Sequence, residues 1–167
     1  MASKKPKLKK LSATKKSPAE QLKDAVFFVD RSSGRYSLIN GLKSLGLAVE
    51  SHDDHFVPNT PDIEWITHCG KQGWIIVSSD KAIKKNLLEK QAIFSSKVAA
   101  FFYTSASISS AKQISSFTVA LRKISGLVLN QTRPFIARIS PDGSVELWMN
   151  HKGEDLIAQK LARKMKK

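Results

Sequence analysis

Three aspartates in this sequence stand where a fold could bring them together. Asp30 ends the uncharged run from Ala25 to Val29, Asp80 follows a second apolar run, and Asp62 opens a helical pattern. A strand built for a dry core needs no carboxylate at its end, because Asn or Gly would serve equally well in a turn. The positions of these acids therefore raise the question of what chemistry they share.

Apolar runs and helical repeats alternate along the first hundred residues. We expect strands over 25–29, 47–50, 74–78 and 98–104, and helices over 35–45, from Pro61 (capped by Thr60) to Gly70 or Gly73, over 81–93 and over about 107–129. A hairpin is expected over 134–149. The alternation predicts an α/β fold with a mostly parallel central sheet and a C-terminal β-hairpin. Such sheets bind ligands at the carboxyl ends of their strands, where Asp30 and Asp80 would lie.

The helix that begins at Pro61 places Asp62 on its apolar side. With residues 100° apart, Asp62 lies at the centre of the arc formed by Trp65, Ile66 and Cys69, and Glu64 lies on the opposite side. A carboxylate in an apolar arc is costly unless it is paired or holds a ligand. We therefore expect Asp62 to face the body of the protein and Glu64 to face water.

Each acid also has a purely structural interpretation. Asp30 could cap a turn and pair with Arg31, Asp62 could stabilise the first turn of its helix, and Asp80 could be the N-cap of a helix beginning at Lys81. Three carboxylates in one cleft, however, repel each other unless a cation lies between them. Oxygen ligands favour Mg²⁺ or Mn²⁺, and such an ion can activate water for phosphodiester hydrolysis.

The segment SHDDHF offers a different metal site. His52, Asp53, Asp54 and His55 could bind a transition metal, although a solvated turn is the simpler interpretation. In that case Asp53 or Asp54 could still support the aspartate site by holding a water.

Charge divides the chain into three parts. The net charge is +14, and residues 1–19 hold seven lysines and no acid, while residues 151–167 hold six Lys or Arg and two acids. We expect a disordered lysine-rich arm over 1–19, one domain over 20–150 and a basic helix or tail over 151–167. The basic ends suit nucleic-acid phosphates, an acidic partner or simple solubilisation. A single cysteine and the lack of a membrane-length apolar run favour a cytoplasmic protein without a membrane partner.

Five segments, VFFVDRSSGR, LGLAVESHDDHF, PNTPDIEWI, GWIIVSSDKAIKKN and PFIARISPDGSVEL, together resemble the PIN-like domains grouped with VapC-type toxins. The resemblance runs from about Val26 to Leu147. It implies a PIN-type, Rossmann-like three-layer sandwich and a Mg²⁺- or Mn²⁺-dependent endoribonuclease, with RNA and a cognate antitoxin protein as partners. Members of that family often pair as homodimers, although no strip of this sequence marks such an interface.

The resemblance assigns roles to the acids. Asp30 matches the family's acid at the end of the first strand, and Asp62 matches the acid that opens the central helix. Asp80 matches the acid of a Thr-x-Asp segment, with Ser78 in the threonine's place. These three residues would be the catalytic, metal-holding set.

The sequence also departs from the family pattern. A glutamate expected between the first two acids is missing from residues 31–49, and Ala82 stands where many relatives have a further aspartate. The candidates for the missing acid are Glu50, Asp53, Asp54 and Glu64. Because the sequence has fewer acids than the family pattern, the alternative function is that of a catalytically silent PIN-like module that only binds RNA.

Four cations close to the acids are candidates for RNA phosphate contacts: Arg31, Lys81, Lys84 and Lys85. Such contacts would position a strand of RNA without selecting its sequence. The alternative is that they are an ion pair and a solvated helix start.

Overall fold

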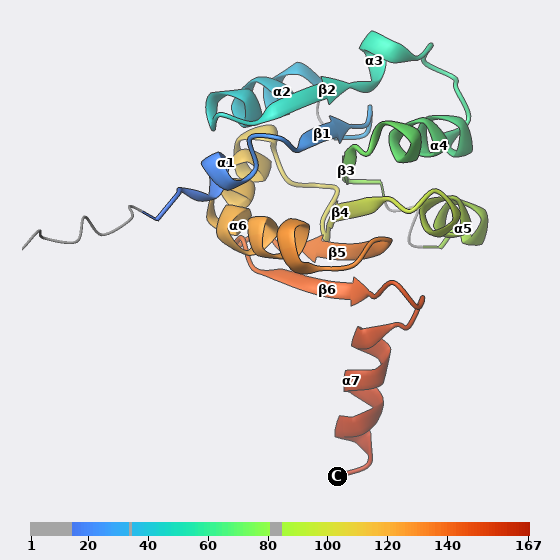
Figure 1. Ribbon diagram of the computed structural model, residues 1–167. Coiled ribbons are helices and arrows are strands. Elements are labelled where there is room, and N and C mark those ends of the chain that lie inside the picture. Colours follow the sequence, from blue (N-terminus) through green and yellow to red (C-terminus); the bar gives the residue numbers. More distant parts are fainter. Residues whose placement is uncertain (1–14, 34, 81–84) are drawn as a thin grey trace, which may run out of the picture.

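The protein is built on one six-stranded sheet with the strand order β2-β1-β3-β4-β5-β6 (Figure 1). The computed structural model describes residues 15–33, 35–80 and 85–167. The first five strands in this order are parallel, and β6 runs antiparallel to β5. The strands are β1 (Val26–Val29), β2 (Ala48–Ser51), β3 (Ile75–Ser78), β4 (Ala99–Tyr103), β5 (Phe135–Ile139) and β6 (Val145–Met149). The predicted α/β class, mostly parallel sheet and C-terminal hairpin are confirmed.

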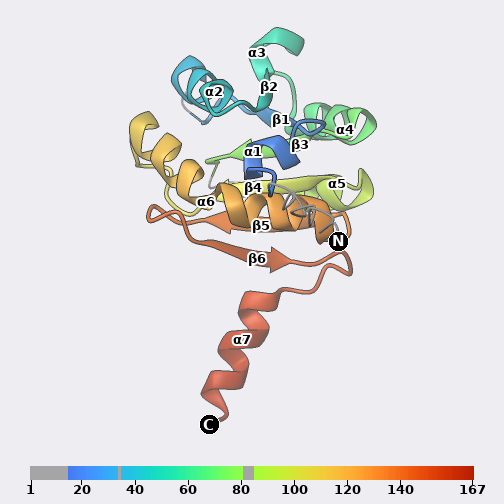
Figure 2. The ribbon, with the colours of Figure 1, turned by 60° about the vertical axis from the view of Figure 1, so that its left-hand side comes forward.

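Helices cover both faces of the sheet and make three layers (Figures 1 and 2). One face carries α1 (Pro18–Gln21), α2 (Arg35–Ser44) and α6 (Ser110–Asn130), and the other carries α4 (Asp62–Gln72) and α5 (Leu87–Ser95). The short α3 (His52–His55) follows β2 directly. The last helix, α7 (Leu156–Met165), projects away from the body and lies in the segment predicted as a basic helix or tail.

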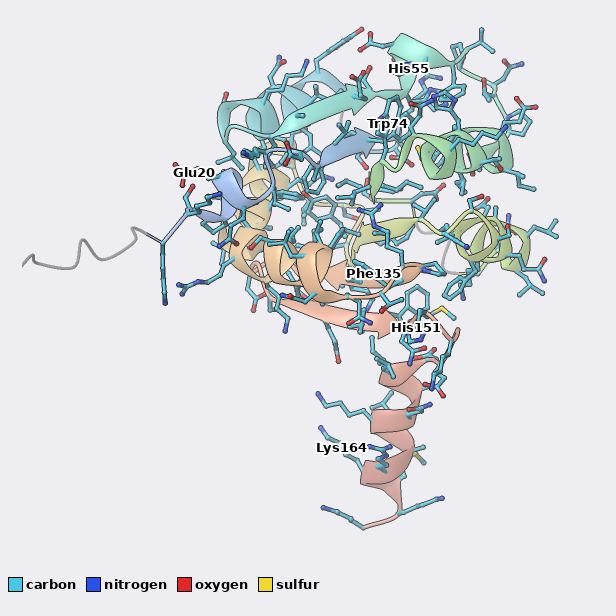
Figure 3. All side chains as sticks on the ribbon, in the orientation of Figure 1. Glu20, His55, Trp74, Phe135, His151 and Lys164 are labelled. Carbon is cyan, nitrogen blue, oxygen red and sulfur yellow. The ribbon has the colours of Figure 1, made fainter. Side chains whose placement is uncertain are left out.

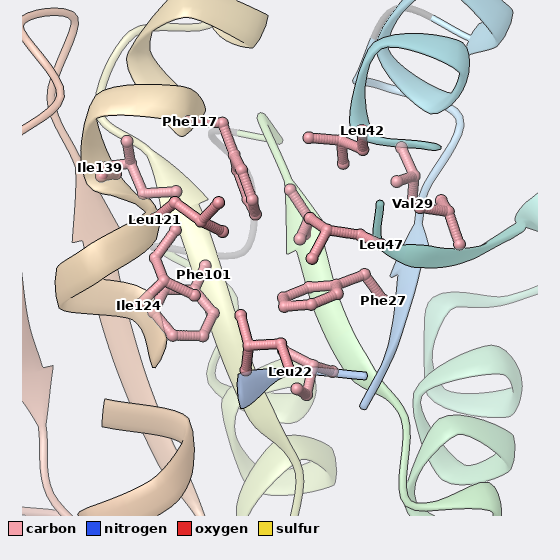
Figure 4. Close-up of a cluster of buried hydrophobic side chains, with 14 of the residues drawn as sticks. Leu22, Phe27, Val29, Leu42, Leu47, Phe101, Phe117, Leu121, Ile124 and Ile139 are labelled. Carbon is pink, nitrogen blue, oxygen red and sulfur yellow. The ribbon is translucent and has the colours of Figure 1, made fainter. Parts of the chain in front are cut away.

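Alternate residues of each strand feed two separate cores, because successive side chains of a strand point to opposite faces. Phe27 and Val29 join the cluster beneath α2 and α6 (Figure 4), whereas Phe28 joins the cluster beneath α4 and α5. Phe28 stacks on Trp65 and Trp74, with ring centroids 5.5 Å and 5.9 Å apart. Burial on both faces explains why these strands appear in the sequence as continuous apolar runs.

Two helix boundaries differ from the prediction. The N-cap of α4 is Pro61, which offers no side-chain cap, and the Thr60 hydroxyl instead donates to the Val57 carbonyl at 2.8 Å. Gly70 lies inside α4, and the helix ends at Gly73, whose left-handed backbone (φ 70°) favours glycine.

Of the helix predicted over 81–93, the described residues show α5, which begins at Leu87. Its N-cap is Asn86, whose side chain accepts a hydrogen bond from the Leu88 N–H at 3.0 Å. Residues 81–84 lie outside the described part of the chain, so the interpretation of Asp80 as the N-cap of a helix beginning at Lys81 stays a prediction.

Two short helices lie in segments that were not predicted to be helical. The loop expected after β2 contains α3, and α1 begins at Pro18, inside the segment predicted as an arm. The rest of that arm, residues 1–14, lies outside the described residues. No helix in the described part of the chain is long and apolar enough to cross a membrane.

Candidate active site

The carboxyl ends of β1 and β3 lie side by side at the centre of the sheet. The two strands are parallel neighbours with Val29 opposite Val77, and the Asp30 N–H donates to the Val77 carbonyl at 3.3 Å. This register places Asp30 next to Ser78, and Asp80 follows two residues later. The edge of the sheet predicted to bind a ligand therefore carries the first and last of the three aspartates.

The Asp30 carboxylate is enclosed by serine hydroxyls. Ser33 donates to Oδ1 at 2.9 Å and Ser78 to Oδ2 at 2.7 Å, while Ser32 lies within 2.8 Å and 2.9 Å of the two oxygens. Only 6% of Asp30 is exposed. The Ser32 hydroxyl thus occupies the position between the two oxygens where a cation would be bound by both.

Burial raises the pKa of Asp30 to about 6, because a charged carboxylate is poorly solvated there. The hydrogen bonds from Ser78, Ser32 and Ser33 oppose this rise by stabilising the charged form, and the neighbouring charge of Asp80 adds to it. Asp30 and Asp80 therefore act on each other electrostatically, as the sequence argument expected of acids in one cleft.

A second layer of serine contacts fastens the two loops together. The Ser79 N–H donates to the Ser33 hydroxyl at 2.8 Å, and the Ser79 hydroxyl donates to the Ser32 carbonyl at 2.8 Å. The Asp80 N–H donates to the Ser78 hydroxyl at 3.1 Å. Ser78 consequently contacts both the Asp30 carboxylate and the backbone N–H of Asp80.

Asp62 lies at the start of α4, half-buried, and faces the body of the protein as predicted. The indole N–H of Trp65 donates to its Oδ1 at 2.9 Å and fixes the carboxylate. Glu64 is exposed on the other side of the helix. The helical spacing was sufficient for this orientation, because a regular helix fixes which residues share a face.

A fourth acid, Glu89 of α5, joins the site. Burial raises the pKa of Glu89, and a hydrogen bond with the Asp62 carboxyl together with the charges of Asp62 and Asp80 raises it further. Asn86 donates to Glu89 Oε1 at 2.8 Å, but Oε2 is buried and has no donor among the described residues. Two carboxylates can share a hydrogen bond only if one holds a proton, so a bound cation is the other way to relieve their contact.

Glu89 was missed from the sequence because its local pattern has another meaning. Asn86 and Glu89 are three residues apart at a helix start, and this spacing is typical of a capping pair. The charge of Asp80 raises the pKa of Asp30, and the charges of Asp62 and Asp80 raise the pKa of Glu89. The four acids are therefore linked electrostatically in the order Asp30, Asp80, Glu89, Asp62.

The donor set suits a hard divalent cation, but it is not assembled as a finished metal site. Carboxylate oxygens are the ligands that Mg²⁺ and Mn²⁺ prefer, and Oε2 of Glu89 has no hydrogen-bond donor in the described part of the chain. Within residues 15–33, 35–80 and 85–167, however, no three Asp, Glu, His or Cys side chains are grouped closely enough to hold a metal ion. Binding would require Ser32 to turn away from Asp30.

The other predicted site residues lie around this centre. Asp53 pairs with Arg31, whose Nε lies 2.8 Å from Oδ1, and Arg31 also donates to the Pro58 carbonyl at 3.2 Å. Arg31 is therefore held in an ion pair, the structural alternative for this residue. Asp54 and Lys85 are exposed, and Lys81 and Lys84 lie outside the described residues.

The histidines of α3 do not form the alternative metal site. His55 Nε2 lies 2.8 Å from Glu50 Oε2 and its ring packs near Trp74, at 5.0 Å between centroids. His52 is buried, with its Nδ1 3.6 Å from Asp53. The two rings thus have different surroundings, and no metal-binding group is found in the described part of α3.

Comparison with family models gives a match to part of the chain. Residues 25–105 match a family model described as a PIN like domain, and no curated protein or solved structure matched the chain. The match covers the four acids and ends before α6, so the resemblance of the later segments remains a prediction. PIN-like domains are generally nucleases and typically use divalent metals. Residues 25–105, just under half of the chain, therefore match the PIN-like domain family.

Proposed function

We propose that the protein is a Mg²⁺- or Mn²⁺-dependent endoribonuclease. The observation that supports this most is the series of four carboxylates near the carboxyl ends of β1 and β3, in which one buried Glu89 oxygen has no donor among the described residues. Mutual repulsion makes such a cluster costly to the fold unless a cation or proton compensates it. A divalent cation also neutralises phosphate charge, which suits an RNA substrate.

Asp30, Asp62 and Asp80 would hold the cation together with Glu89. When bound, the metal would supply a water of lowered pKa and polarise the scissile phosphodiester. Trp65 orients Asp62 through its 2.9 Å hydrogen bond, and Ser78 orients both Asp30 and the backbone at Asp80. The serines keep Asp30 ionised in spite of its burial, which maintains the negative charge that the cation needs.

The direct test is a cleavage assay on mixed RNA with Mg²⁺, with Mn²⁺ and with EDTA. We expect cutting that requires metal and is lost in Asp80→Asn, with RNA binding retained because a repulsive charge is removed. Glu64→Gln is the matched control, since it neutralises an exposed acid on α4 that faces away from the site. Metal-independent cutting, or an equal loss in Glu64→Gln, would overturn the proposal.

The resemblance to VapC-type proteins further suggests that the ribonuclease is the toxin of a toxin–antitoxin pair. Expression of the wild-type chain should then arrest growth of a bacterial host, and expression of Asp80→Asn should not. Equal growth of both strains at equal protein levels would contradict the toxin role without contradicting the nuclease.

One observation favours a second candidate, a catalytically silent RNA-binding module. All hydrogen-bonding positions of the Asp30 carboxylate are taken by Ser32, Ser33 and Ser78, which is how a purely structural carboxylate would be held. This candidate predicts RNA binding with no cutting under any metal in the same assay.

A further inference from the structure

The C-terminal helix α7 stands away from the rest of the protein. Figures 1 and 2 show it leaving β6 and extending beyond the sheet, and the sticks of Figure 3 show Lys164 on this projecting part. Asp155 caps its start by accepting from the Ala158 N–H at 2.9 Å, and Ile157 packs against the core beneath α4 and α5. Farther along, Leu161 is 57% and Met165 88% exposed. A ten-residue helix with so little support is only marginally stable in water, which indicates a binding partner.

The cations of α7 gather on one side. At 100° per residue, Lys160, Arg163, Lys164 and Lys167 fall within an arc of about 100°. Residues 156–167 hold five Lys or Arg and no acid. Lys160 approaches Glu146 of β6 at 3.9 Å, whereas no ion pair involves Arg163, Lys164 or Lys167 within the described part of the chain. This basic stripe is therefore largely uncompensated and complements a polyanion.

We propose that the basic stripe of α7, Arg163, Lys164 and Lys167 with Lys160 at its base, binds the phosphates of the single-stranded RNA whose cleavage is proposed above. A second copy of the chain is disfavoured because two acid-free helices would repel each other. An anionic membrane is disfavoured because a helix that lies in a membrane needs a broad face of large apolar side chains, and on α7 only Leu161 and Met165 are both large and exposed.

The fold places this stripe far from Asp30 and Asp80. β6 is antiparallel, so it ends beside the start of β5, at the edge of the sheet opposite to Asp30, and it lies three strands away from β3. At about 4.8 Å per strand that is about 14 Å across the sheet alone. An RNA must therefore be long to touch both places, and α7 would act as a holding arm that selects longer single strands.

The test compares neutralised variants by RNA binding in EDTA, where no metal-dependent cutting occurs. The variant R163Q/K164Q/K167Q keeps good helix formers on α7. The control K43Q/R122Q/K123Q removes the same charge from exposed positions of α2 and α6. The probe is a fluorescent single-stranded RNA of mixed sequence, from a tetramer to a twenty-mer, at about 50 mM to about 200 mM salt.

We expect the α7 variant to weaken binding of the twenty-mer about tenfold at the lowest salt and to reduce the salt slope by about 2, because each lost phosphate contact contributes about 0.7. The tetramer should show a much smaller loss, and the control variant should change little. Equal losses in both variants would mean that only net charge matters, and an equal loss for the tetramer would mean that α7 lies within the site. Either result would overturn the proposal.

Two further measurements separate the alternatives. Binding of wild-type chain to anionic phospholipid vesicles that is lost in the α7 variant, with RNA binding unchanged, would assign the stripe to a membrane. A dimer in light scattering that dissociates in Leu161→Glu, again with RNA binding unchanged, would assign α7 to self-association. Because these readouts need no catalysis, failure of the nuclease proposal and failure of the α7 proposal are distinguishable.

Discussion

Asp30 is the central residue of the candidate site, and its surroundings shift its pKa in opposite directions. Burial favours the neutral acid, whereas three serine hydroxyls favour the carboxylate. The result is a pKa of about 6, so the group is mostly ionised at neutral pH but at a cost to the fold. A fold retains such a cost most readily where the charge serves a function.

The raised pKa of Asp30 predicts how the free energy of unfolding depends on pH. Its folded pKa of about 6 lies above the ordinary value of 3.8, so between these values the folded state holds a proton that the unfolded chain has lost. The stabilising contribution is fully present below pH 3.8 and is lost as the pH rises through 6. The difference corresponds to about 3 kcal/mol. We expect Asp30→Asn to flatten this decline and to raise the free energy of unfolding at pH 7.5.

Urea unfolding in EDTA at a series of pH values measures this effect. Asp24→Asn is the control, since Asp24 is exposed and lies outside the site. An unchanged pH slope between 4 and 7 in Asp30→Asn would show that Asp30 does not titrate as its burial requires.

Glu89 offers a second test at the level of single residues. In Glu89→Gln the carbonyl oxygen can still accept from Asn86, and the new amide can donate to Asp62. We therefore expect the fold to be kept or stabilised while metal-dependent RNA cleavage falls about 10-fold to 100-fold, the usual cost of disturbing a metal site. Cleavage rates and thermal midpoints measured together separate the two effects, and a wild-type rate would exclude Glu89 from the site.

The acids differ in how far the sequence revealed them. Asp30, Asp62 and Asp80 were predictable, because strand ends and helical spacing are local patterns with fixed geometry. Glu89 was not predictable, because the acid with which it interacts most strongly, Asp62, lies on another helix and no local spacing in the sequence connects the two. The serine contacts were missed for the same reason, since Ser33 and Ser79 meet only when β1 and β3 pair.

At the level of elements, the site depends on how closely α4 and α5 approach each other. These helices carry Asp62 and Glu89, and Gly70 of α4 lies against the turn that ends α5. A Cβ at Gly70 would collide with the Ser96 carbonyl oxygen and lie 2.6 Å from the Ser96 Cβ. The collision with backbone can be relieved only if the two helices move apart.

We therefore expect Gly70→Ala to destabilise the protein by about 1–3 kcal/mol and to reduce cleavage. Gly126→Ala on α6 is a matched control, because nothing lies within 4 Å of its new Cβ. That control should instead stabilise by about 0.5–1 kcal/mol, since alanine is the better helix former. Urea unfolding of both variants measures whether the free energy of unfolding falls in Gly70→Ala and rises in Gly126→Ala. An unchanged free energy of unfolding in Gly70→Ala would show that α4 and α5 are loosely packed.

Strands were easier to predict than helix ends. Burial on both faces gave β1, β3 and β4 an unbroken apolar signature, whereas the start of α5 depended on whether Lys81 or Leu87 began the helix. Helical propensity alone favoured the earlier start, and the Asn86 cap placed it later. The α3 turn was missed because SHDDHF has no apolar periodicity.

The described part of the molecule separates its charges, with four acids near the carboxyl ends of β1 and β3 and the basic stripe on α7. This arrangement attracts a divalent cation to one place and RNA phosphates to the other. It also means that the native state carries a repulsion between acids that the unfolded chain lacks. A cation that binds the folded site should therefore stabilise the entire domain, by an amount set only by its concentration relative to its dissociation constant.

This linkage predicts that Mg²⁺ or Mn²⁺ raises the thermal midpoint. At about 100 times the dissociation constant the gain is about 2.7 kcal/mol, and for a chain of this size each kcal/mol corresponds to about 2–4 °C. The increase should disappear in Asp80→Asn and persist in Glu64→Gln, because only the first removes an acid of the site. Differential scanning calorimetry with and without metal measures it and requires no RNA. An equal rise in all three proteins would mean that the metal acts on general surface charge, and no rise in the wild type would favour the silent RNA-binding module.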